Sequence, residues 1–126
     1  MGPSSDVRDL HEILAWVVVF ANGITGAWVL AAHWREAVRT AAMWWAVHAA
    51  HATVAVQLTV GAAIVATSDV EVGSEHAFYG FLALLAVGLI VGYRQLSQYR
   101  YLLYGLGGLF IMGLSIRAMT LPGLAG

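Results

Sequence analysis

Apolar residues in this chain gather in long uninterrupted runs rather than alternating with polar ones. Four such runs, at residues 13–32, 41–67, 77–93 and 101–116, contain no Asp, Glu, Lys or Arg. The apolar core of a bilayer is ~30 Å thick, and about 20 residues of α-helix cross it, with roughly 17 to 25 usual. The first run has this length, and the second is long enough to tilt or to project past the interface. The last two runs are shorter. They span the bilayer with the help of flanking Tyr, His or Arg side chains that extend to the headgroups.

These runs predict an all-α fold, a polytopic integral membrane protein built as a four-transmembrane-helix bundle. A β-barrel also satisfies the backbone within lipid, but it needs many ~10-residue segments in which apolar and polar residues alternate. The runs do not alternate and are rich in Ala and Leu, so the pattern excludes a barrel. No linker divides the chain, and we therefore expect residues 1–126 to form a single membrane domain with helices at about 12–33, 41–67, 76–93 and 100–120.

Composition agrees with a lipid environment. The chain is 60% hydrophobic and only 10% charged, with a mean hydropathy of +0.77, whereas soluble domains carry about 25% charged residues. The net charge of −1 and the absence of a basic run argue against a nucleic-acid partner. The chain has no cysteine, which excludes disulfides, thiolate metal sites, iron–sulfur clusters and covalently attached haem.

The distribution of arginine predicts the orientation in the membrane. The segments before the second and fourth runs each carry two arginines, whereas segment 68–75 carries three acidic residues and no arginine. By the positive-inside rule the two arginine-bearing segments are cytoplasmic, so both termini are expected outside. We expect a retained first helix rather than a cleaved signal peptide, because residues 1–12 are net acidic and a signal peptide begins with positive charge. The expected location is a bacterial cytoplasmic membrane.

Polar side chains within the apolar runs are the best functional clue, because they are unfavourable in lipid. His11, Asn22 and His33 follow one another at intervals of eleven residues, close to three helical turns, so they share one helix face. We expect that face to point into the bundle, with Thr25 beside it. The simplest interpretation is that Asn22 and Thr25 form hydrogen bonds between helices, while the two histidines lie at the interfaces.

His48 and His51 lie within the second run, three residues apart and therefore on one helix face. Unpaired imidazole nitrogens facing lipid would be disfavoured by several kcal/mol, so both side chains need partners. The candidate partners are hydrogen-bond acceptors, a metal, a haem iron, a quinone or a proton that is transferred along the helix. Ordinary interhelical hydrogen bonding explains the pair equally well. Gln57 is expected on a different face, in contact with another helix or subunit.

A second group of candidate ligands opens the first and third helices. His11 and Glu12 begin the first helix, Glu75 and His76 begin the third, and the expected topology puts both pairs at one depth. Two His and two Glu suit a divalent metal such as zinc or copper, and histidines on facing helices also suit bis-imidazole ligation of a b-type haem. Solvated interfacial residues are the alternative, because neither pair has a specific ligand spacing.

Small residues predict where the helices approach each other closely, because packing rather than hydrophobicity joins helices in lipid. Gly23 and Ala27 lie four residues apart in the first helix, and Gly88 and Gly92 do so in the third. The fourth helix is expected to use Gly105, Gly107, Gly108 and Gly113.

Haem b is the most specific cofactor hypothesis, since helix bundles build cofactor sites from side chains on facing helices. The candidate cofactor-binding residues are His11, His76, His48 and His51, although the first two and the last two lie in opposite halves of the membrane and cannot serve one haem. We therefore expect a small membrane subunit or accessory protein of a larger electron-transfer assembly, holding a b-type haem or a quinone through histidine.

Two alternatives come from other classes of protein. One is a homo-oligomeric channel or transporter whose path is lined by His48 and His51, and the other is a structural scaffold without a ligand. The chain contains no stand-alone catalytic motif, because HAAH at residues 48–51 lacks the glutamate of a zinc protease helix. The expected partners are the lipid bilayer and membrane-protein subunits or further copies of the chain.

Overall fold

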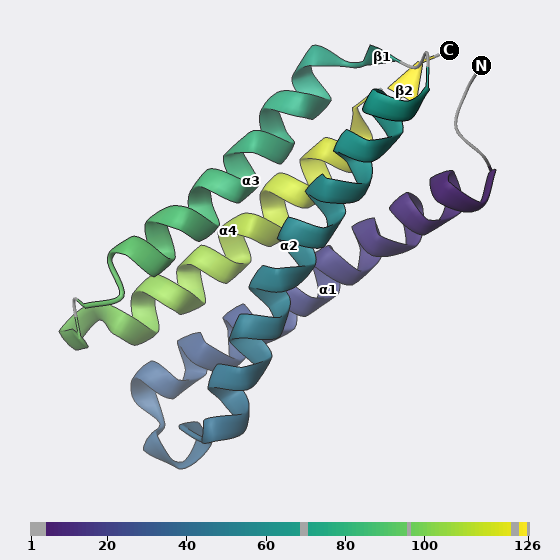
Figure 1. Cartoon of the computed structure of the whole chain (residues 1–126). Helices are drawn as coiled ribbons and strands as arrows, with labels where there is room; N and C mark the ends of the chain where they lie inside the picture. Colours follow the sequence, from purple (N-terminus) through teal and green to yellow (C-terminus); the bar gives the residue numbers. More distant parts are fainter. Residues whose placement is uncertain (1–4, 69–70, 96, 122–123, 126) are drawn as a thin grey trace.

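The computed structural model of the chain describes residues 5–68, 71–95, 97–121 and 124–125. It confirms the all-α prediction, because the described residues form four helices that are each long and apolar enough to cross a membrane (Figure 1). The helices are α1 (Ser5–Trp34), α2 (Ala41–Thr67), α3 (Ser74–Gly92) and α4 (Arg100–Thr120).

Short elements close the two ends of the bundle. Strands β1 (Glu71–Val72) and β2 (Leu124–Ala125) pair antiparallel at the end where α1 begins and α4 ends, which we call the terminal end (Figure 1). The 3₁₀ turns η1 (Glu36–Val38) and η2 (Ser97–Tyr99) lie at the opposite end. We call this the arginine end, and its arginines are Arg35, Arg39, Arg94 and Arg100.

The helix boundaries follow the apolar runs, with one difference at the start of the chain. Helix α2 begins after Thr40, whose hydroxyl accepts a hydrogen bond from the Met43 backbone N–H over 3.3 Å. Helix α1 begins at Ser5, ahead of the expected residue 12. An apolar run marks only the part of a helix that suits lipid, and the polar turns before it contain no helix breaker, with Asp6 placed favourably in the first turn.

Helices α1 and α4 pack backbone to backbone through glycine. A Cβ atom added to Gly105 would lie 2.7 Å from the backbone nitrogen of Leu30, and one added to Gly108 would lie 2.9 Å from the Cα of Gly26. The expected contacts of Gly88 and Gly92 are not found among the described residues, because nothing lies within 4 Å of a Cβ built on either. The spacing of glycines shows that a helix allows another helix to approach closely. It does not show which face of the helix is in contact with a neighbour.

Asn22 confirms the expected hydrogen-bonding role within the bundle. Its side chain is 1% exposed, and its Nδ2 donates to the carbonyl of Ala50 on α2 over 3.3 Å. Thr25 is also buried, but its hydroxyl donates to the carbonyl of Ala21 in its own helix over 2.7 Å. Of the two expected contacts, Asn22 therefore makes the link between helices.

Large apolar side chains cover the outside of the bundle. Ile24 is 64% exposed, and Phe20, Phe78 and Phe110 are also exposed. Exposed apolar surface of this extent is typical of a face that meets lipid or another protein. Inside, a smaller apolar core joins the helices, with Val29, Ala32, Met43 and Ile111 completely buried.

Candidate functional site: a histidine cleft at the terminal end

The imidazoles of His11 and His76 face each other at the terminal end of the bundle. His11 lies in the second turn of α1 and His76 in the first turn of α3, and their ring centroids are 6.3 Å apart with an angle of 58° between the ring planes. The two helices begin at the same end, so their first turns lie at one depth. The fold thus brings together two half-buried imidazoles that are 65 positions apart in the sequence.

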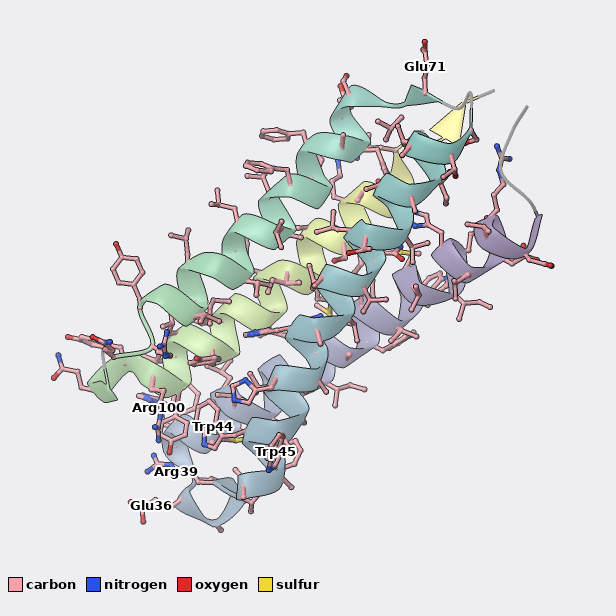
Figure 2. The ribbon with its side chains drawn as sticks, in the orientation of Figure 1. Glu36, Arg39, Trp44, Trp45, Glu71 and Arg100 are labelled. Atoms are coloured by element: carbon pink, nitrogen blue, oxygen red, sulfur yellow. The ribbon has the colours of Figure 1, made fainter. Side chains whose placement is uncertain are left out.

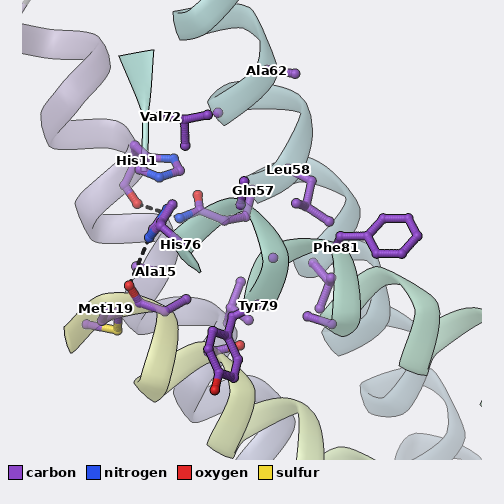
Figure 3. A pocket seen from close by; sticks show the side chains of 18 of the residues that line it. His11, Ala15, Gln57, Leu58, Ala62, Val72, His76, Tyr79, Phe81 and Met119 are labelled. Carbon is purple, nitrogen blue, oxygen red and sulfur yellow. Dashed lines mark hydrogen bonds between the residues drawn. The ribbon is translucent and has the colours of Figure 1, made fainter. Parts of the chain in front are cut away.

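A hydrogen bond from α4 orients His76. Its Nδ1 lies 2.8 Å from the carbonyl oxygen of Ala118, and because a carbonyl only accepts, Nδ1 must carry the proton (Figure 3). In a neutral imidazole the other nitrogen, Nε2, then keeps its lone pair. This is the arrangement by which proteins commonly fix a metal-binding histidine, with one nitrogen bonded to the backbone and the other available as a ligand.

His11 is held between α1 and α2 by two contacts. Gln57 of α2 donates from Nε2 to the backbone carbonyl of His11 over 2.8 Å (Figure 3). A Cβ atom on Gly61, one turn further along α2, would lie 3.3 Å from Cε1 of the His11 ring, so glycine makes room for the imidazole. Sequence reasoning missed this part of the site. The sequence does contain an indication of this contact, because Gln57 is the only residue with a side-chain amide in the second apolar run.

Two buried polar atoms of this site have no hydrogen-bond partner among the residues that the structure describes. They are Nδ1 of His11 and Oε1 of Gln57. A buried polar atom without a partner is unfavourable by about 1–3 kcal/mol, so such atoms in a cleft commonly meet a ligand or a water molecule. Both of these atoms without a hydrogen-bond partner belong to side chains that line the same cleft.

That cleft has a volume of about 970 Å³ and receives residues from all four helices (Figure 3). It exists because α2 and α3 make few contacts with each other, while α1 packs on α2 and α4, and α3 packs on α4. Its size lies at the upper end of the range of ligand sites, about 300–1,000 Å³. Most of its walls are apolar, and its polar side chains gather near the terminal end. They include Arg8, His11, Glu12, Gln57, His76 and Ser115.

The predicted carboxylate ligands do not gather with the two histidines. Glu12 lies at the rim of the cleft and Glu75 is exposed, next to His76 in sequence. Within the described part of the chain, no three His, Asp or Glu side chains come close enough together to hold a metal ion. A metal site made of His11, Glu12, Glu75 and His76 therefore stays a prediction.

The second predicted pair, His48 and His51, lies away from this cleft. His48 is exposed on the outside of α2. The ring of His51 is half-buried and stacks on Tyr104 of α4, with the centroids 5.9 Å apart and the planes 13° from parallel. One imidazole thus packs inside the bundle and the other faces outwards, although their spacing of three residues predicts one common face of α2.

Comparison with models of protein families, with curated proteins and with solved structures finds no match to this chain.

Proposed function

We propose that the chain is an integral membrane protein and a small subunit of an electron-transfer assembly. In it, the histidine cleft would bind a b-type haem, which His11 and His76 would hold. The observation that carries this proposal is the pair of facing imidazoles, 6.3 Å apart between centroids, on two helices that begin at the same end. Four candidate membrane-spanning helices support the membrane location.

The separation of the rings suits a metal held between them. With a metal–nitrogen bond of about 2 Å and a ring nitrogen about 1 Å from the centroid, imidazoles on opposite sides of one ion have centroids about 6 Å apart. Around a tetrahedral ion the same two ligands would have centroids about 5 Å apart. The 6.3 Å between the centroids in this chain therefore leaves room for one metal ion held by both rings.

The surroundings of the two rings also suit a haem. Nε2 of His76 keeps its lone pair because Nδ1 donates to Ala118. The cleft has the volume for a large flat ligand, and small residues such as Ala15, Gly61 and Ala77 leave its walls open. Arg8, which also lines the cleft, offers a positive charge for the carboxylates of a haem. When bound, a bis-histidine haem supplies reversible one-electron transfer.

A quinone in the same cleft is the second candidate, favoured by the unmet Oε1 of Gln57 and Nδ1 of His11. A hydroquinone has hydroxyl groups that donate hydrogen bonds, and the oxidised form has carbonyl groups that accept them. An amide oxygen beside an imidazole offers a partner for both forms. The cleft opens between helices that are apolar outside, so a lipid-soluble ligand would enter it from the bilayer.

An absorption spectrum separates the two candidates. The protein is purified in detergent, supplied with hemin, and recorded oxidised and then reduced with dithionite. Haem binding predicts a Soret band and a sharp reduced α-band, both lost in His11→Ala and in His76→Ala and retained in His48→Ala, the exposed histidine that serves as the matched control. If the protein shows neither a Soret band nor a reduced α-band after unbound hemin has been removed by gel filtration, the haem proposal is overturned.

The quinone candidate is then tested by binding of a menaquinone analogue to the same preparations. Gln57→Leu should abolish that binding, because the variant keeps the size of the side chain and removes both polar atoms. Binding that persists unchanged in Gln57→Leu would exclude the quinone site.

A further inference from the structure

Two arginines at the arginine end converge on one tyrosine ring. The guanidinium carbon of Arg39, just before α2, lies 4.3 Å from the centroid of Tyr101, and that of Arg100, the first residue of α4, lies 5.3 Å from it. Arg100 also lies 4.7 Å from the ring of Trp44. Figure 2 shows Arg39, Arg100 and Trp44 together at this end of the bundle, far from Glu71 at the other end.

Arg39 is held in place by the end of α1. Its Nε donates to the carbonyl of Ala32 over 2.7 Å, and its Nη2 donates to the carbonyl of His33 over 3.2 Å. A cation that binds the last carbonyls of a helix is favoured there by the helix dipole. The side chain is therefore fixed, and its Nη1 remains directed at Glu36, 3.8 Å away.

The charge at this cluster is largely uncompensated. Glu36 is the acidic partner found for these two arginines within the described residues, and its side chain is 88% exposed, so solvent weakens the pair. Arg100 has a hydrogen bond to the hydroxyl of Tyr101 over 3.3 Å. Its Nε is buried and has no hydrogen-bond partner in the part of the chain that the structure describes.

The start of α4 has no side-chain cap among the described residues. Tyr99 precedes the helix, and its side chain makes no capping hydrogen bond, so the first backbone N–H groups of α4 have no side-chain acceptor there. The N-terminal end of a helix carries partial positive charge and favours an anion. Two guanidinium groups, a buried unmet Nε and an uncapped helix start thus meet in one place.

We propose that Arg39 and Arg100 bind a phosphate group, that of an anionic phospholipid. A phosphate offers several oxygens to the guanidinium donors of Arg100. Its charge also offsets that of Arg39, whose Nε and Nη2 already donate to carbonyls of α1. Arginine, Trp44 and Tyr101 in one cluster are typical of the headgroup level of a membrane protein. The proposal rests on the membrane location but not on haem, which lies at the opposite end.

Thermal unfolding in detergent tests this site. The wild-type protein is heated with phosphatidylglycerol, with phosphatidylcholine or with inorganic phosphate, and bound lipid is counted by native mass spectrometry. Phosphatidylglycerol should raise the midpoint and stay bound, whereas phosphatidylcholine should do neither. In Arg100→Gln the apparent affinity for phosphatidylglycerol should fall about tenfold. In Arg35→Gln, which removes one charge from an exposed arginine at the same end, it should stay within about twofold.

Several results would overturn the proposal. Equal effects of the two lipids would show that the site does not select an anionic lipid. Equal losses in Arg100→Gln and Arg35→Gln would mean that only the total positive charge of this end matters and that no specific site exists. The same shift with inorganic phosphate alone would support the phosphate chemistry and overturn a lipid as its source. If Arg100→Gln does not fold, Arg100→Lys replaces it, because lysine keeps the charge and lacks the fork. Unchanged affinity in that variant would also exclude the site.

Discussion

Asn22 of α1 donates a hydrogen bond from its side chain to the backbone carbonyl of Ala50 on α2, over 3.3 Å, while almost completely buried. The same Nδ2 also bonds to the carbonyl of Val18 one turn earlier in α1, over 2.9 Å. One amide thus joins two helices near the middle of the chain's first apolar run. Its position fixes how α1 and α2 lie along each other, and it leads to the first prediction.

Asn22→Ala should lower the free energy of unfolding by about 1 kcal/mol, because interhelical hydrogen bonds in membranes contribute roughly 0.6 kcal/mol on average and up to about 1.7. The measurement is unfolding in mixed micelles of increasing SDS content. Thr25→Ala is the control, because among the described residues the Thr25 hydroxyl bonds only to carbonyls of α1. A larger loss in Thr25→Ala than in Asn22→Ala would contradict this account.

Gly105→Ala should destabilise the bundle by about 1–3 kcal/mol. The new Cβ would lie 2.7 Å from a backbone nitrogen and 2.8 Å from a Cα of Leu30, neither of which can move without shifting a helix. In Gly88→Ala the new methyl group meets none of the described residues within 4 Å, and alanine favours the helix by up to about 1 kcal/mol. The same SDS titration compares the two variants.

If Gly88→Ala proved as damaging as Gly105→Ala, the outer face of α3 would have to be in contact with something outside the chain. Chemical crosslinking of the two variants would then show whether that contact is a second copy.

If the cleft holds a haem as proposed, Gly61→Ala should reduce haem binding several-fold without unfolding the protein. Its Cβ would lie 3.3 Å from Cε1 of His11, so the imidazole must turn or shift by a few tenths of an ångström. Axial ligation depends on ring orientation, because neighbouring residues hold a ligating imidazole in place. The readout is the height of the reduced α-band per mole of protein. Gly113→Ala, with nothing within 4 Å, is the matched control and should bind as the wild type does.

A Gly61→Ala protein with an unchanged spectrum would show that the contact between α2 and His11 does not position the ligand. Far-ultraviolet circular dichroism of both variants keeps that result separate from a loss of folding.

His51→Ala should lower stability by about 1 kcal/mol, whereas His48→Ala should leave it unchanged. The His51 ring stacks on Tyr104, whose ring in turn meets Trp44 edge-on at 5.2 Å between centroids, and aromatic pairs of this kind contribute about 0.5–1.5 kcal/mol. His48 is exposed and has no such contact to lose. Thermal unfolding in detergent measures both. Proton flux in proteoliposomes that is lost in His48→Ala would instead favour a path between copies of the chain.

Much of the architecture could be derived from the order of residues. Uncharged runs long enough to cross a bilayer predict four helices, because backbone polar groups in lipid must be satisfied within the helix itself. The structure has those helices, with α2 at the predicted boundaries and α1 extended back to Ser5. The depth of His11 and His76 also follows from the topology, since α1 and α3 begin at the same end.

Which helix faces meet was decided by the tertiary structure. Gly26 and Gly108 form the close contact between α1 and α4, while Gly88 and Gly92, with an equally suitable spacing, face outwards. Gln57 contacts another helix, as expected, but the sequence did not indicate that its partner there is His11. Helical periodicity tells which residues share a face of one helix, but the rotation of that helix depends on all its neighbours at once. The ring-to-ring distance of the histidines, and with it the chemistry proposed for the cleft, depends on that rotation and could not be obtained from the sequence alone.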